Sequence, residues 1–216
     1  MNCTKESICL YLVTDRAWTT NQTLYQQVEL ALKGGVTCVQ LREKELSFEE
    51  FLQQAIQLAK LCKAYKVPFI VNDNLQVALQ SNADGIHVGQ GDIVPKEIRR
   101  HAGDRLMIGV SVHTLEQALT AVQDGADYLG VGAVFSTATK SDAEQVPLSV
   151  LQEICSNVNV PVVAIGGIQK NNIMQLQSTG VDGVAVVSAI LSAQNIQQAA
   201  EELKVLSSQM GKDNAV

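Results

Sequence analysis

The sequence has few aromatic residues and no excess of positive charge. Only 4% of its 216 residues are aromatic, whereas 46% are hydrophobic. The core must therefore consist mainly of Val, Ile, Leu and Ala, which are the side chains that fill barrel layers. The formal net charge of −6 argues against a nucleic-acid-binding protein, because such proteins usually present a basic face to the phosphate backbone. An anionic small molecule would have to meet locally placed cations.

Paired cysteines and long apolar runs are also missing. The five cysteines are odd in number and lack CxxC spacing, so neither a disulfide framework nor a zinc site is indicated. We therefore expect a cytoplasmic protein. The apolar stretch at residues 8–13 is too short to cross a membrane and lacks the basic start of a signal peptide. These absences predict a protein without nucleic-acid or membrane partners, and they leave open whether it forms a homo-oligomer.

Short β-branched segments alternate with longer segments of helical period along the whole chain. Before the third of the strand-like segments, apolar residues recur at three- and four-residue steps between Phe48 and Cys62. Ser47 and Glu50 precede this stripe as a capping box, and Thr114 and Gln117 predict a second box. Eight segments have the length and composition of strands, namely Ile8–Asp15, Thr37–Arg42, Phe69–Asp73, Gly85–Gly89, Met107–Val112, Tyr128–Phe135, Val162–Gly166 and Gly183–Ser188.

Three helix-to-strand junctions resemble one another, which suits a barrel built from repeated βα units. They read NADGIHVG from Asn82, GADYLGVG from Gly125 and GVDGVAVV from Gly180. Gly34, Gly125 and Gly180 are each expected to end a helix in the left-handed conformation. We therefore predict an α/β fold, a single (β/α)8 TIM barrel over residues 1–216. A doubly wound open sheet is the alternative, but no glycine-rich phosphate motif follows the first strand.

Polar residues gather where the predicted strands end, which is where TIM barrels have their active sites. After the second strand, period-two geometry points Gln40, Arg42 and Lys44 to one side and Leu41 toward the helices. An Arg fork and a Lys point charge together suit a diphosphate. The alternative is a solvated charge pair with Glu43.

Two aspartates follow adjacent strands in the predicted barrel. Asp73 comes after the third strand and Asp92 after the fourth. Mg²⁺ typically takes one or two protein carboxylates together with substrate phosphates and water, so the pair predicts a magnesium site. Each aspartate has an alternative role as the cap of the helix that follows it.

Hydroxyls and glycines follow the sixth, seventh and eighth strands. The segment 137–140 offers two hydroxyls and one ammonium, and the loop that contains it runs to Pro147, long enough for a lid. Gly166 and Gly167 follow the seventh strand and Ser188 ends the eighth. Loops at these two places form the usual TIM-barrel phosphate site. A plain surface loop and a structural glycine turn are the respective alternatives.

The three histidines do not form a nucleophilic arrangement with any Ser or Cys. His87 lies within a strand and is expected to be a satisfied interior residue, His101 is expected at an exposed helix end, and only His113 could reach the site. The predicted barrel strands also lack a lysine that could form a Schiff base. The chemistry is therefore expected to depend on metal and phosphate.

Taken in order, seven short motifs resemble those of the thiamine-phosphate synthase family and cover nearly the whole chain. They are QLREK from Gln40, VNDN from Val71, GIHVGQGD from Gly85, GVSVHT from Gly109, FSTATK from Phe135, AIGGI from Ala164 and VVSAI from Val186. The resemblance implies a transferase that joins an aminopyrimidine methyl diphosphate to a thiazole phosphate and releases diphosphate, with Mg²⁺ as cofactor.

The resemblance also implies roles for individual residues, four of them catalytic: Arg42, Lys44, Ser111 and Lys140. The pyrimidine diphosphate would be held by Gln40, Leu41, Arg42, Glu43, Lys44, Asn72, Ser111 and Lys140. The thiazole phosphate would be held by Thr137, Ala138, Thr139, Gly167, Val187 and Ser188, and Mg²⁺ by Asp73 and Asp92.

One departure and two alternatives accompany the resemblance. Ala133 and Ser136 stand where the family's lid loop carries prolines, which implies a less preorganised loop. The first alternative is a thiazole tautomerase-like barrel that does not couple two substrates. The second is a non-catalytic sensor that binds a phosphate ligand at Gly166, Gly167 and Ser188.

Overall fold

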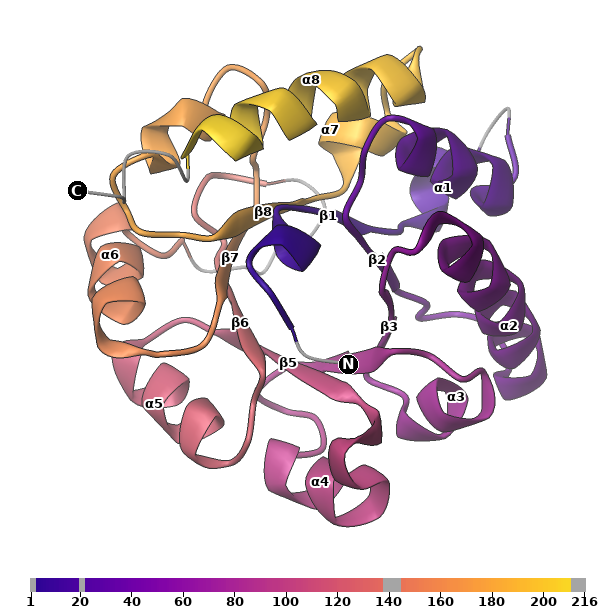
Figure 1. Ribbon diagram of the computed structural model, residues 1–216, viewed down its shortest axis with the longest axis horizontal. Coiled ribbons are helices and arrows are strands. Elements are labelled where there is room, and N and C mark those ends of the chain that lie inside the picture. The colour runs from indigo at the N-terminus through magenta and orange to yellow at the C-terminus, as the bar shows by residue number, and fades with distance from the viewer. Residues whose placement is uncertain (1–2, 20–21, 138–144, 211–216) are drawn as a thin grey trace.

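A closed barrel of eight parallel strands in chain order forms the centre of the molecule (Figure 1). The computed structural model describes residues 3–19, 22–137 and 145–210. All eight predicted strands are present, so the predicted (β/α)8 barrel is confirmed. The strands are β1 (Leu10–Val13), β2 (Cys38–Leu41), β3 (Phe69–Asn72), β4 (Gly85–Val88), β5 (Met107–Val112), β6 (Tyr128–Val131), β7 (Val162–Ile165) and β8 (Gly183–Val186).

Helices surround the barrel and connect its strands (Figure 1). They are α1 (Leu24–Lys33), α2 (Phe48–Tyr65), α3 (Leu75–Gln80), α4 (Pro95–Ala102), α5 (Leu115–Gln123), α6 (Leu148–Asn157), α7 (Ser188–Leu191) and α8 (Ile196–Met210). Four short 3-10 helices complete the described elements: η1 (Glu6–Ile8), η2 (Arg16–Trp18), η3 (Gly103–Arg105) and η4 (Ile173–Leu176). No helix in these described segments is long and apolar enough to cross a bilayer.

The predicted capping boxes have different outcomes. Ser47 and Glu50 form the expected reciprocal box at the start of α2. At α5 the Thr114 hydroxyl accepts a hydrogen bond from the Gln117 amide, but the Gln117 side chain accepts from the His113 amide instead of the Thr114 amide. The second predicted capping box is therefore wrong, because the Gln117 side chain bonds the His113 amide and not the N-cap amide.

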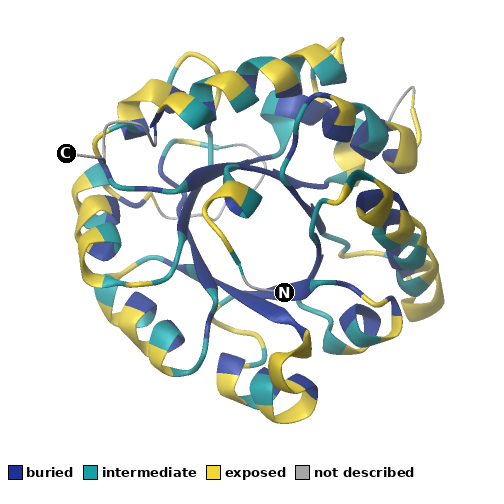
Figure 2. Ribbon diagram, viewed as in Figure 1, coloured by how far each residue is buried: buried dark blue, intermediate teal, exposed yellow. Residues whose placement is uncertain are grey.

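Side chains alternate between two cores, as a period of two requires. Outward-facing strand residues pack against the helices in one large aliphatic cluster that includes Val39 and Leu41. Burial follows the ring of strands, while the outer helix faces are exposed (Figure 2). The inward-facing side chains form a second cluster, whose buried members are Ile8, Tyr11, Val13, Cys38, Ile70, Met107, Tyr128, Val163 and Ala185.

The helix-to-strand junctions confirm two of the three glycine predictions. Gly125 and Gly180 have φ values of 98° and 84°. Gly34 has φ −81°, so its prediction is wrong, and the left-handed residue is Gly35 with φ 93°. Position 34 has no room for a side chain, because a Cβ on Gly34 would lie 2.6 Å from the Cβ of Ala200 on α8.

Four equivalent side chains tie the strands together in pairs at the N-terminal end of the barrel. Each follows by two positions a residue with positive φ, namely Gly35, Asn82, Gly125 or Gly180. Thr37, Asp84, Asp127 and Asp182 each accept a hydrogen bond from a backbone amide at the start of the preceding strand. The donors are Leu10, Phe69, Ile108 and Val162, at 2.7–2.9 Å. The three junctions that look alike in sequence therefore have the same role, which is to join two neighbouring strands.

The N-terminal segment covers the same end of the barrel. The helix η1 lies over the ring of strands in Figure 1, with Ile8 in the interior cluster. The Lys5 ammonium lies 2.7 Å from the Asp182 carboxylate. This end is therefore closed by packing and ion pairing, and the opposite end is left for a site. All five cysteines are free.

Candidate active site

A cavity of about 510 Å³ opens at the C-terminal ends of the strands. It draws residues from strands on all sides of the barrel, as expected for a TIM-barrel active site. Eleven of the predicted site residues line it: Gln40, Arg42, Lys44, Asn72, Asp73, Asp92, Ser111, Thr137, Gly167, Val187 and Ser188. Ala138, Thr139 and Lys140 lie outside the described residues, as does most of the expected lid.

Two predicted residues do not line the cavity with their side chains. Leu41 is fully buried between the barrel and the helices, because strand alternation turns it outward. Glu43 accepts two hydrogen bonds of 2.8 Å from Nε of Arg16, and its side chain is only 2% exposed. Neither side chain therefore lines this cavity, and contacts between these two residues and a substrate stay a prediction. The alternative of a charge pair between Glu43 and Arg42 or Lys44 is also wrong, since Arg16 is the partner.

Asp73 lies at the cavity in a conformation that is unusual for a non-glycine residue. Its φ is 62°, and such strain tends to be retained at functional sites. The Lys44 ammonium donates to its Oδ2 at 2.6 Å. Burial and the neighbouring Asp92 carboxyl nevertheless raise the pKa of Asp73 above its ordinary value, against the opposing effect of Lys44.

Neither aspartate caps a helix, so both capping alternatives are wrong. The N-cap of α3 is Asn74, whose side chain accepts from the Val77 amide at 3.0 Å. Asp92 instead accepts from the Gly89 amide at 2.8 Å, while α4 has Val94 as its N-cap and no side-chain cap. Both carboxyl groups are therefore left at the cavity.

The donor set fits Mg²⁺ better than a metal that needs a closed protein cage. Within the described segments, no group of three or more His, Cys, Asp and Glu side chains could hold a metal ion. Two carboxylates, here Asp73 and Asp92, suffice for Mg²⁺ because it keeps water and substrate phosphate as its other ligands. Burial, and after it the neighbouring Asp92 carboxyl, raise the pKa of Asp73, and a bound cation would oppose both effects.

Glycines and the start of α7 form the opposite side of the cavity. Gly166 and Gly167 have φ values of 99° and 63°, and a Cβ on Gly167 would lie 2.8 Å from the Phe135 carbonyl oxygen. The loop after β7 thus packs directly against the loop after β6. Asn172 fixes this turn by donating to the Gly167 carbonyl at 2.9 Å. Ser188 is the first residue of α7 and also lines the cavity.

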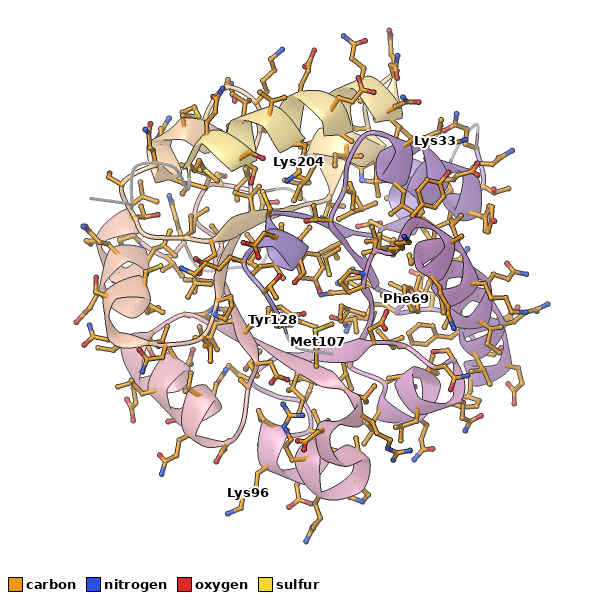
Figure 3. The ribbon with its side chains drawn as sticks, viewed as in Figure 1. Lys33, Phe69, Lys96, Met107, Tyr128 and Lys204 are labelled. Atoms are coloured by element: carbon orange, nitrogen blue, oxygen red, sulfur yellow. The ribbon has the colours of Figure 1, made fainter. Side chains whose placement is uncertain are left out.

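A line of hydrogen bonds crosses the cavity floor, and we call its five residues the interior polar chain: Gln40, Tyr11, Tyr128, His87 and Ser111. Gln40 Nε2 donates to the Tyr11 hydroxyl at 2.8 Å, and the Tyr11 and Tyr128 hydroxyls are 2.8 Å apart. His87 Nδ1 lies 3.1 Å from the Tyr128 hydroxyl, and His87 Nε2 lies 2.9 Å from the Ser111 hydroxyl. Figure 3 shows Tyr128 inside the ring of strands.

The histidine predictions are confirmed with one exception, since His87 lines the cavity together with His113, and the tyrosines were missed. Burial lowers the pKa of His87 to about 4, as expected for a satisfied interior histidine. His101 is exposed at the end of α4, and His113 lines the cavity. Tyr11 and Tyr128 also line it, although sequence reasoning did not select them. Their inward parity on β1 and β6 was the available signal.

Comparison with known proteins decides the family. Residues 10–190 match the family model described as thiamine monophosphate synthase. The chain belongs to the thiamine monophosphate synthase family. The resemblance seen in the ordered strand-end motifs is thereby confirmed, and these motifs come from the segments that line the cavity.

Relatives in the thiamine monophosphate synthase family match almost end to end. The thiamine-phosphate synthase of Clostridium acetobutylicum is 50% identical over 191 residues, which is 88% of this chain and 90% of the relative. That of Alkaliphilus oremlandii is 49% identical over 195 residues, or 90% of this chain and 93% of the relative. The solved thiamine phosphate pyrophosphorylase of Pyrococcus furiosus superposes with a TM-score of 0.89 at 38% identity, covering 96% of this chain and 98% of that one.

A more distant structure shares only the fold with this family member. A solved 3-hexulose-6-phosphate synthase superposes with a TM-score of 0.66 at 17% identity, covering 91% of this chain and 98% of that one. The likeness supports the barrel and carries no information on the reaction.

Proposed function

We propose that the chain is a transferase that couples an aminopyrimidine methyl diphosphate to a thiazole phosphate, giving thiamine phosphate and diphosphate with the help of Mg²⁺. The observation that carries the proposal is the division of one cavity into two anion-binding sides. Arg42, Lys44 and two carboxylates lie on one side, and a glycine turn with Ser188 lies on the other. Two phosphorylated substrates in one cavity need such a division.

The diphosphate side combines fixed and metal-borne positive charge. Arg42 supplies a planar fork for phosphate oxygens and Lys44 a mobile ammonium. Asp73 and Asp92 would hold Mg²⁺, which when bound neutralises the negative charge that collects on the departing diphosphate. The Lys44 ammonium forms an ion pair with Asp73. Because Lys44 also lines the cavity, it could bind a phosphate oxygen there.

The thiazole phosphate side depends mostly on backbone groups. Gly167 allows a phosphate to approach the main chain closely, and Ser188 and Thr137 add side-chain hydroxyls at the same cavity. Val187 contributes an apolar contact beside them. The resemblance adds Ala138 and Thr139 to these proposed contacts, and it adds Lys140 to the proposed contacts of the pyrimidine diphosphate.

The residues at the cavity need only bind, orient and exclude water. The methylene carbon loses its bond to the diphosphate oxygen, which leaves with the electron pair, and the thiazole nitrogen supplies the pair for the new C–N bond. The amino group on the pyrimidine ring donates electron density to the methylene carbon as the bond breaks. These bond changes require no side-chain nucleophile.

The test is a mixture of purified protein, both substrates and Mg²⁺, with thiamine phosphate measured by mass. Product is expected, and it should disappear when EDTA is added or either substrate is left out. The tautomerase alternative predicts no coupling but conversion of a thiazole isomer. The sensor alternative predicts tight binding of thiazole phosphate without any conversion. Folded protein that gives no product would overturn the proposal.

The cytoplasm is the location that we propose. Five free cysteines support a reducing compartment, where thiols are kept unpaired. Two of these thiols, Cys38 and Cys62, are buried. Burial raises the pKa of the Cys62 thiol to about 12, so it stays protonated and unreactive at neutral pH.

A further inference from the structure

The loops after β1 and β2 are joined by an ion pair that the proposed reaction does not use. Arg16 Nε donates to both carboxylate oxygens of Glu43 at 2.8 Å, and Arg16 Nη2 donates to the Gln54 side chain on α2 at 3.1 Å. The Glu43 side chain is only 2% exposed, so water can do little to replace this partner. A buried carboxylate that loses its partner is costly. The pair therefore differs from exposed surface pairs, which add little to stability.

Glu43 lies between the two cations of the diphosphate side. Arg42 precedes it and Lys44 follows it, and both line the active-site cavity. The backbone of this segment is also held from β1, because the Arg42 amide donates at 3.0 Å to the hydroxyl of Thr14, which is fully buried. Anchoring the Glu43 side chain therefore fixes the short backbone segment from which both cations project.

A second cavity, of about 360 Å³, adjoins the first. Its lining consists of Asp15, Arg16, Ala17, Arg42, Glu43, Lys44 and Glu45. Arg42 and Lys44 thus border both cavities. Side chains that border two cavities are not fixed by close packing alone. Their positions depend on the backbone that the ion pair anchors.

The helix η2, which carries Arg16, is itself held in place. The Asp15 side chain caps it by accepting from the Ala17 amide at 2.9 Å. At its other end, the Gln27 side chain of α1, which is buried, donates to the Trp18 carbonyl at 2.7 Å. Arg16 therefore reaches Glu43 from a support that is fixed at both ends.

We propose that Arg16 and Glu43 are positioning residues that hold the two cations on either side of Glu43 at the diphosphate. They act through the loop after β2, which they fix so that its guanidinium fork and its ammonium meet the same group of phosphate oxygens. Preorganised cations bind an anion more tightly because less conformational freedom is lost on binding. This inference rests on the proposed function, because it assigns that side of the cavity to a diphosphate.

The experiment measures binding of inorganic diphosphate, with Mg²⁺ present, by calorimetry on the wild-type chain and on variants that change the charge in opposite directions. Arg16→Gln removes a positive charge, and Glu43→Gln removes a negative one. Both break the two-pronged contact, so both are expected to weaken diphosphate binding about tenfold, the size of one lost charge-assisted hydrogen bond. Arg16→Lys keeps the charge but not the fork, and about threefold weakening is expected.

A role through charge alone predicts shifts of opposite sign. Diphosphate would then bind more weakly to Arg16→Gln and more tightly to Glu43→Gln, and this result would overturn the proposal. Wild-type affinity in both variants would overturn it too, as would a wild-type chain that does not bind diphosphate. If Glu43→Gln does not fold, Arg16→Lys decides the question, since its charge is unchanged: weaker binding supports the proposal and wild-type affinity overturns it.

Thiazole phosphate is the second probe, because it is expected to bind at the glycine turn on the opposite side of the cavity. Its affinity should be the same in the wild-type chain and in all three variants. Equal weakening of both probes would mean a general loss of structure and would overturn the positioning role.

The control variant is Arg100→Gln. Arg100 forms a largely exposed ion pair with Glu97 within α4, so its replacement changes the net charge as Arg16→Gln does and leaves the loop after β2 intact. Both probes are expected to bind it with wild-type affinity. A tenfold loss of diphosphate binding in Arg100→Gln would attribute the effect to net charge and contradict the proposal.

Failure of the coupling reaction would look different. Wild-type protein that binds diphosphate, with the expected weakening in the variants, but forms no thiamine phosphate would leave the positioning inference standing and refute the proposed function alone.

Discussion

The two ends of the barrel use aspartate in opposite ways. At the N-terminal end, Asp84, Asp127 and Asp182 accept hydrogen bonds from strand amides and so join neighbouring strands. At the C-terminal end, Asp73 and Asp92 lie close enough for Asp92 to raise the pKa of Asp73. One end uses its carboxylates to join strands, whereas the other places them at the cavity. The same residue type thus stabilises the sheet at one end and lines the proposed metal site at the other.

The largest effect is expected from removing a carboxylate at the C-terminal end. Asp92→Ala should lower turnover about 100- to 1000-fold, the size of one lost preorganised electrostatic contact, with little change in the free energy of unfolding. Steady-state kinetics and urea unfolding measure the two quantities. Asp104→Ala, an exposed aspartate in η3, is the control that should change neither. Near-normal turnover in Asp92→Ala would remove this residue from the mechanism.

His87 lies inside the barrel, between its two ends, and we expect it to make the free energy of unfolding fall at acidic pH. Burial lowers the pKa of His87 to about 4, so the unfolded chain, with an ordinary histidine pKa of about 6.5, binds the proton more readily. Stability is therefore fully present above pH 6.5 and falls as the pH drops toward 4, by about 2–3 kcal/mol from this group.

Urea unfolding at several pH values in this window checks the histidine contribution. His87→Gln should have a flatter dependence than the wild-type chain, since the contribution of this histidine is removed. Parallel curves for the two proteins would contradict the assignment of a neutral, buried His87.

A carboxylate at the N-terminal end should affect stability and not turnover. Asp127→Ala leaves the Ile108 amide without its acceptor and removes the partner of Arg99. The free energy of unfolding should fall by about 1–3 kcal/mol, the cost of a buried amide without a partner. The rate per folded molecule should stay at the wild-type value. A large loss of turnover in this variant would break the division between the two ends.

The smallest effect is expected for an exposed ion pair on the surface. Lys170 and Glu202 are 2.8 Å apart with much of both side chains exposed, and such pairs add little to stability. Lys170→Ala should leave the thermal midpoint and the turnover unchanged within error. A clear drop in the thermal midpoint would contradict this expectation and show that the exposed ion pair stabilises the fold.

Much of the fold could be predicted because its signals are local. Strand length, β-branched composition and the repeated junctions indicated eight βα units, and the inward parity of Gln40, Arg42 and Lys44 followed from the period of two. The errors were also local in origin. Gly34 and Gly35 are adjacent glycines, so the local pattern does not say which one has the left-handed conformation, which belongs to Gly35.

The site was less predictable wherever a residue's partner comes from a distant part of the chain. An aspartate after a strand can cap a helix or face a cavity, and only the three-dimensional positions of Asn74 and Gly89 exclude capping for Asp73 and Asp92. Tyr11 and Tyr128 are 117 positions apart in the sequence. Their contact across the barrel depends on closure of the sheet, which no local pattern specifies.

The most direct test of the account is the rate of thiamine phosphate formation as free Mg²⁺ is raised, starting from EDTA-treated protein. The account predicts no rate without metal, a saturable rise with Mg²⁺, and a midpoint at clearly higher Mg²⁺ in Asp73→Asn, because one carboxylate of the proposed site is lost. A rate that does not depend on Mg²⁺, or the same midpoint in both proteins, would contradict a magnesium-dependent coupling site at the C-terminal end of the barrel.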